Sequence, residues 1–80
     1  MEFISRVDQL ATELKNGISG SMGGVQQAMM KACHGVLTTK GAKISANILM
    51  ELRELFLTSI ADATAETRYG AAKCLGAIIH

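Results

Sequence analysis

The sequence predicts an all-α fold, a small helical bundle of three to four helices with a Gly-rich loop after the first one. Three observations support this prediction. Apolar residues recur at helical spacing, the 80 residues contain no proline, and half of the eight glycines lie in one short segment. A chain of this length forms one domain at most, so we expect a single helical domain over residues 1–80.

The first predicted helix covers Phe3–Leu14. Its apolar residues follow the i, i+3, i+4, i+7 series, and polar side chains such as Asp8 occupy the opposite face. The pair Asn16-Gly17 then predicts the end of this helix, because helices often end on a glycine in the left-handed conformation. The segment Gly17–Gly24 has no periodicity, so we expect a flexible loop there.

Two further helices are predicted in the middle of the chain. The second is expected over Val25–Leu37 and ends at Thr38–Gly41. The third begins near Ile44, and apolar residues cover well over half of its circumference, which places Leu52 and Phe56 at the centre of the core. Because three short neighbours offer too little surface to cover this helix, we also expect an oligomer or an obligate complex.

A fourth helix is predicted at the end of the chain. Three residues within Asp62–Thr67 can each cap a helix start, and the apolar period resumes over Tyr69–Ile79. The alternative is one continuous helix, since neither glycine nor proline lies between Ala42 and Tyr69.

The segment Ile48–Ile79 resembles a hairpin of the HEAT type. It has an apolar helix, a turn that contains aspartate, and then the run ETRYGAAKCLG from Glu66 to Gly76. The resemblance covers about 40% of the chain and implies a pair of packed helices. A stacked repeat array generally needs three or more units, and the first half of the chain does not repeat the pattern. The resemblance is therefore interpreted as convergent packing of a hairpin.

Charge and cysteine content indicate a soluble protein in a reducing compartment. Eight Lys and Arg against seven Asp and Glu give a net charge of +1, without the basic excess of a nucleic-acid binder. Cys33 and Cys74 lie within apolar helical patterns and are expected to be free thiols. No signal peptide or membrane span is predicted. We expect a cytoplasmic location, or the host-cell cytosol for a protein encoded by a virus or an effector gene.

No catalytic residue, cofactor, metal site or small-molecule substrate is predicted. The glycine-rich segment matches neither a Walker A loop nor a dinucleotide fingerprint. Cys33 and His34 are adjacent on a helix, so their side chains point about 100° apart and neither can act on the other. Cys74 and His80 are six positions apart, which is poor spacing for two metal ligands on one helix.

A strip of small side chains on the fourth predicted helix indicates a close contact with another helix, from this chain or a second one. The predicted protein interface consists of Met29, Met30, Gly70, Cys74, Gly76 and Ala77. We therefore expect a non-enzymatic protein-protein interaction module that acts through apolar helix faces on a protein partner or in a homo-oligomer. It could be a small helical adaptor, a chaperone, an inhibitor or an assembly subunit.

The alternative is a small nucleic-acid-associated regulator that uses the segment Lys15–Lys43. This segment contains lysines and no acidic residue. Lys31, Lys40 and Lys43 would be its nucleic-acid contacts. The acidic residues on either side offset this local charge, so nucleic acid is the less favoured partner.

Overall fold

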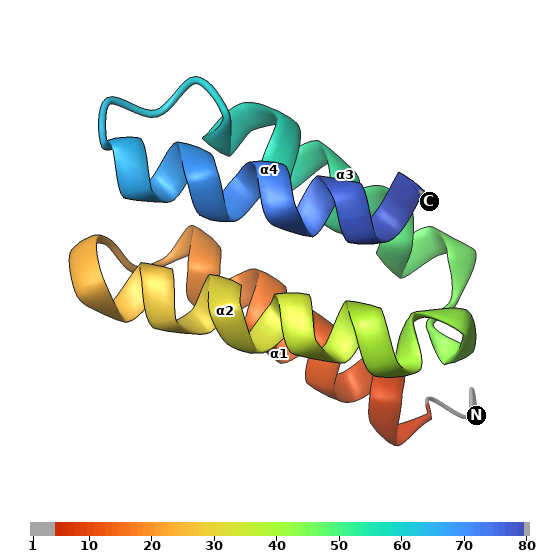
Figure 1. Cartoon of the computed structure of the whole chain (residues 1–80). Helices are drawn as coiled ribbons and strands as arrows, with labels where there is room; N and C mark the ends of the chain where they lie inside the picture. Colours follow the sequence, from red (N-terminus) through yellow and green to blue (C-terminus); the bar gives the residue numbers. More distant parts are fainter. Residues whose placement is uncertain (1–4, 80) are drawn as a thin grey trace.

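The computed structural model describes residues 5–79, with the backbone alone for residue 79. The helices are α1 (Arg6–Ser19), α2 (Gly23–Lys40), α3 (Ala46–Ser59) and α4 (Ala65–Ile79), and a 3-10 turn, η1 (Gly41–Lys43), follows α2. Hairpins α1–α2 and α3–α4 stack so that α2 and α4 lie side by side and run in the same direction (Figure 1). The all-α prediction is confirmed. None of the helices over residues 5–79 has the length and apolar character needed to cross a bilayer.

Helix α1 begins after Ser5, whose hydroxyl accepts the backbone N–H of Asp8 at 3.1 Å. A serine here supplies an acceptor to one of the N–H groups that the first turn leaves free. The predicted start at Phe3 lies outside the described residues. The predicted end was wrong, because the helix passes through Gly17 and ends at Ser19.

Packing at the end of α1 explains why Gly17 does not end the helix. Ile18 is fully buried, and burial of such a side chain gains about 1.5–3 kcal/mol, more than the roughly 1 kcal/mol that a glycine costs inside a helix. Gly17 also allows α2 to come close, since a Cβ at this position would lie 2.6 Å from Met29 Sδ. The expected flexible loop Gly17–Gly24 was therefore wrong, and only residues 20–22 connect the two helices.

Helix α2 begins on a glycine with a left-handed backbone. Gly23 has a φ of 65°, a conformation that side chains with a Cβ rarely adopt. The helix ends at Lys40, within the predicted stretch Thr38–Gly41.

The break predicted near Asp62 is confirmed, since α3 ends at Ser59 and α4 begins at Ala65. Two side chains satisfy the backbone of the connection. Asp62 Oδ1 accepts the N–H of Thr64 at 2.8 Å, and Arg68 Nη1 donates to the carbonyls of residues 62 and 63 at 2.7 and 3.0 Å. The second half of the described chain is therefore a hairpin and not one continuous helix.

One cluster of buried apolar side chains joins the four helices. It comprises Ala11, Ile18, Met30, Cys33, Leu37, Ile44, Leu52, Phe56, Ala71, Cys74 and Leu75. Leu52 and Phe56 are fully buried, which confirms their predicted place in the core. Met50 and Leu57 of α3 stay exposed, as does Ile60 directly after the helix, so α3 does carry more apolar surface than its neighbours cover. Whether a second molecule covers it stays a prediction.

Asp8 links the two hairpins. It lies on the face of α1 that was expected to be polar, yet it is only 7% exposed. One carboxylate oxygen accepts the backbone N–H of Ser45 at 2.9 Å, and the other accepts the Ser45 hydroxyl. Because Ser45 immediately precedes α3, the α1 carboxylate stabilises the start of α3. The hydrogen bonds from the Ser45 hydroxyl and backbone N–H hold the pKa of Asp8 below its usual value.

We expect Leu52→Asp or Phe56→Asp to abolish folding. Each substitution places an unpaired carboxylate in the centre of the core, at a cost of several kcal/mol against a net stability of about 5 kcal/mol. Thermal unfolding followed by circular dichroism measures the effect. Leu57→Asp is the matched control, because Leu57 is 44% exposed on the same helix and its variant should melt cooperatively. A native-like transition in either core variant would contradict this placement of the core.

Stability should fall in acid through Asp8. Its pKa is lowered in the folded state, so its contribution is present above the unfolded pKa of about 4 and is lost as the pH falls through the folded value. Urea unfolding over a pH series should show Asp8→Asn less stable than the parent at neutral pH, with a difference that shrinks below pH of about 4. The exposed Glu54→Gln is the control. A difference that is independent of pH would exclude the carboxylate as its cause.

Candidate functional site

Helices α2 and α4 lie in close contact at Met30 and Gly70. A Cβ at position 70 would lie 3.0 Å from Met30 Sδ, so the glycine makes room for the buried methionine. One turn further along α4, the Cys74 thiol donates to the Met30 carbonyl at 3.4 Å. The close contact indicated by the small residues of α4 is therefore made, at these positions, with α2 of the same chain.

The two cysteines meet inside this contact. Cys33 and Cys74 are buried free thiols on α2 and α4. The hydrogen bond with Cys33 and burial both raise the pKa of Cys74, so this thiol stays protonated at neutral pH. His34, which follows Cys33 in the sequence, is half-buried and lines the groove described below, and His80 lies outside the described residues. Within the part of the chain that the structure describes, no three His, Cys, Asp or Glu residues form a group that could hold a metal.

A polar contact joins three helices near the N-terminal ends of α2 and α4. Gln26 Nε2 donates to the Ile18 carbonyl at 3.0 Å, and Gln26 Oε1 accepts the hydroxyl of Thr67 at 3.2 Å. Thr67, proposed from the sequence as a possible helix cap, is instead buried inside α4. The side-chain amide therefore helps to set the position of α4 against α2.

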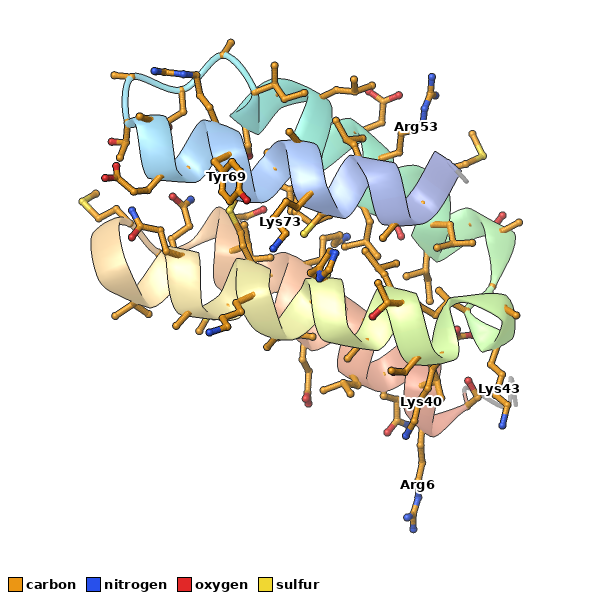
Figure 2. The ribbon with its side chains drawn as sticks, in the orientation of Figure 1. Arg6, Lys40, Lys43, Arg53, Tyr69 and Lys73 are labelled. Atoms are coloured by element: carbon orange, nitrogen blue, oxygen red, sulfur yellow. The ribbon has the colours of Figure 1, made fainter. Side chains whose placement is uncertain are left out.

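A groove of about 450 Å³ lies between α2 and α4, next to the contact of Met30 with Gly70. Its lining residues lie at helical spacing on the facing sides of the two helices: Gln27, Met30, Lys31, His34, Ala65, Glu66, Tyr69, Gly70 and Lys73. Tyr69 is 68% exposed at its edge. Figure 2 shows Tyr69 and Lys73 on the same side of α4, beside α2. Size, shape and an exposed aromatic ring make this groove the best candidate for a binding site.

The charged groups of the groove have no charged partner within residues 5–79. The described residues contain one ion pair, in which Lys15 Nζ lies 3.2 Å from Glu51 Oε1. Lys31, Glu66 and Lys73 therefore have no ion-pair partner among these residues. Lys73 Nζ lies 5.6 Å from the centroid of the Tyr69 ring, within the range of a cation-π interaction. The groove thus carries an aromatic ring and free charges of both signs.

The six predicted interface residues are dispersed. Met30 and Cys74 are buried, and Gly70 lies in the groove floor with Met30. Met29 is half-buried against Gly17, on the side of α2 that contacts α1. Gly76 is exposed and has open space around it.

Ala77, the last of the six, lines a smaller hollow of about 310 Å³ near the C-terminal ends of α2 and α4. The sequence pattern thus located part of the groove floor. It missed Tyr69 and Lys73, for which the helical spacing of charged and aromatic residues on α4 was the available signal, and it named Lys31 only as a nucleic-acid contact.

The lysines predicted to contact nucleic acid do not form one surface. Lys31 lines the groove, and Lys15, which begins the basic segment, is paired with Glu51. Lys40 follows Lys31 by nine residues, which turns it to the opposite side of α2. Figure 2 shows Lys40 and Lys43 near Arg6, at the C-terminal end of α2 and away from Tyr69 and Lys73. Nucleic-acid contacts of these lysines stay a prediction.

Each end of the stack exposes apolar side chains. Arg53 of α3 points away from the α1–α2 hairpin (Figure 2), and Met50 and Leu57, three and four residues from it, share this side and are exposed. Arg6 of α1 points away from the α3–α4 hairpin (Figure 2), and the exposed Leu10 follows it by four residues. Both hairpins therefore have an outer face on which further helices can pack.

The two hairpins also recur at a regular interval. From the start of α1 at residue 6 to the start of α3 at residue 46 there are 40 residues, an interval typical of HEAT-type helical repeats. In the comparison with protein families, the family described as "Stalled ribosome sensor GCN1-like, HEAT repeats" matches residues 8–80. The chain belongs to the GCN1-like HEAT repeat family.

Two curated relatives agree with this assignment. "Stalled ribosome sensor GCN1" of Homo sapiens is 38% identical over 72 residues, and that of Mus musculus is 36% identical over 72 residues. These alignments cover 89% of this chain and 3% of each relative. No solved structure gives a significant match. The HEAT resemblance of residues 48–79 is thus a family relationship that extends over the first half of the chain, and its interpretation as convergence is corrected.

The two glycines of α4 should respond differently to alanine. Gly76→Ala adds a Cβ in open space and should raise the free energy of unfolding by about 0.5–1 kcal/mol. Gly70→Ala has the same intrinsic gain, but its Cβ meets Met30 Sδ at 3.0 Å, so Met30 must shift and the gain should be smaller or reversed. Urea unfolding of both variants measures the difference. Equal gains would mean that the contact with Met30 imposes no constraint.

Proposed function

We propose that this chain is a non-enzymatic helical adaptor, which binds a protein partner in the groove between α2 and α4. The observation that carries the proposal is the groove itself. It lies between one helix of each hairpin and presents the exposed ring of Tyr69, and its Lys31 and Lys73 have no ion-pair partner among the residues that the structure describes. Aromatic anchors with nearby polar groups are typical of protein-binding surfaces.

The names of the relatives suggest where this partner is found. Both are described as sensors of stalled ribosomes, and we propose that the partner of this chain is a ribosome-associated protein. This setting also agrees with the cytoplasmic location predicted from the sequence. Self-association, inhibition and chaperone activity, the other roles considered from the sequence, have no support among these relatives.

The two outer faces of the stack support a role within a longer array. In repeat proteins each unit packs against its neighbours along one axis. Met50 and Leu57 at one end and Leu10 at the other are exposed where such neighbours would pack. The α2–α4 groove opens to the side of the stack, so it would stay accessible in an array.

Site-specific photo-crosslinking tests the proposal. A benzophenone amino acid at position 69 lies at the groove edge, and the same amino acid at the exposed position of Glu13 on α1 is the control. After irradiation in a cell extract with stalled ribosomes, we expect position 69 to form adducts with a protein that sediments with ribosomes, and position 13 to form none. The adduct is identified by mass spectrometry.

Three results would contradict the proposal. Adducts of position 69 with RNA alone would favour the nucleic-acid alternative. Equal adducts from both positions, or none from position 69, would exclude the groove as the protein-binding surface.

A further inference from the structure

Nitrogen-bearing side chains line the groove from both helices. Lys31 and His34 on α2 face Lys73 on α4, since α2 and α4 run in the same direction and residues 30 and 74 are in contact. Both lysine side chains are exposed and neither has a charged partner among the described residues. The Lys73 ammonium lies near the Tyr69 ring, which keeps it close to the groove edge. A carboxylate placed here could interact with both ammonium groups and accept a hydrogen bond from the imidazole.

The floor of the groove next to these charges is apolar. Met30 and Gly70 form it, and Ala65 and the ring of Tyr69 extend it toward the start of α4. The Met30 side chain is buried against Gly70, and its flexible thioether can adapt its shape when a guest side chain packs on this floor. A leucine-sized or aromatic side chain could therefore be buried beside the bound carboxylate.

The groove is poorly suited to a nucleic-acid strand. Glu66 lines it one turn before Tyr69 and Gly70 on α4, and its carboxylate forms no ion pair with any residue of the described part of the chain. A continuous phosphate backbone along the groove would pass this negative charge, whereas a peptide can place an acidic residue at the lysines and a neutral or basic residue at Glu66. The mixed charge of the groove thus favours a peptide.

We propose that the groove between α2 and α4 binds a short protein segment with one large apolar side chain beside an Asp or Glu. The apolar side chain rests on Met30 and Gly70, and its acidic neighbour lies between Lys31 and Lys73. This inference rests on the proposed function and specifies the chemistry of the partner.

A random peptide library displayed on phage, selected against the immobilised 80-residue chain, tests the inference. We expect the selected peptides to combine a large apolar residue with an adjacent acid. A synthetic copy of the most enriched peptide then serves as the probe in fluorescence anisotropy. Its affinity should fall at least about tenfold for the double variant Lys31→Glu, Lys73→Glu, and should weaken at high salt.

The matched control is the double variant Lys40→Glu, Lys43→Glu. It makes the same change in net charge with exposed lysines that do not line the groove. Its affinity for the probe peptide should stay within about twofold of the parent. Circular dichroism checks that both variants melt like the parent, so that a loss of affinity reports binding.

Peptides enriched without an acid, equal losses in the two double variants, or no enrichment would each overturn the inference. Tighter binding of a short single-stranded RNA than of the selected peptide would also overturn it. The crosslinking experiment distinguishes a failure of this inference from a failure of the proposed function. If position 69 still crosslinks to a ribosome-associated protein while the selected peptides lack acids, the proposed function stands and only the acidic character of the partner is wrong.

Discussion

Helix α2 lies close against helix α4 because the side chains at their contact are small or flexible. Gly70 leaves room for the Met30 thioether, and the Cys74 thiol donates to the Met30 carbonyl at 3.4 Å. This contact brings the two hairpins into one stack and closes the core around Leu52 and Phe56. It also forms the floor of the groove, so stability and the candidate site depend on the same few atoms.

Two polar contacts determine how the hairpins are placed on each other. Asp8 accepts two hydrogen bonds from Ser45 at the start of α3, and Gln26 connects the end of α1 to Thr67 on α4. Apolar packing alone tolerates small shifts along a helix, whereas a buried polar group must meet its partner. These contacts therefore restrict the sliding of one hairpin on the other and keep the walls of the groove in register.

Membership of the GCN1-like HEAT repeat family gives a physical reason for the exposed apolar residues. Two hairpins bury one shared interface and leave two outer faces, and Met50, Leu57 and Leu10 lie on these faces. The chain spans 3% of the length of the relatives it matches. In such repeat architectures stability comes from contacts between adjacent units, which leaves the side grooves available to bind other proteins.

The sequence by itself determined the features that depend on local spacing: the helices, the break near Asp62, and the place of Leu52 and Phe56 in the core. It did not determine the end of α1, because the local cost of Gly17 is outweighed by the burial of Ile18. Only the tertiary structure decided that α2 covers the small residues at Gly70, that Asp8 meets a serine 37 residues away, and that an aromatic ring and two lysines share one groove. These groups come from different helices, and helical periodicity carries no information about which faces of two distant helices meet.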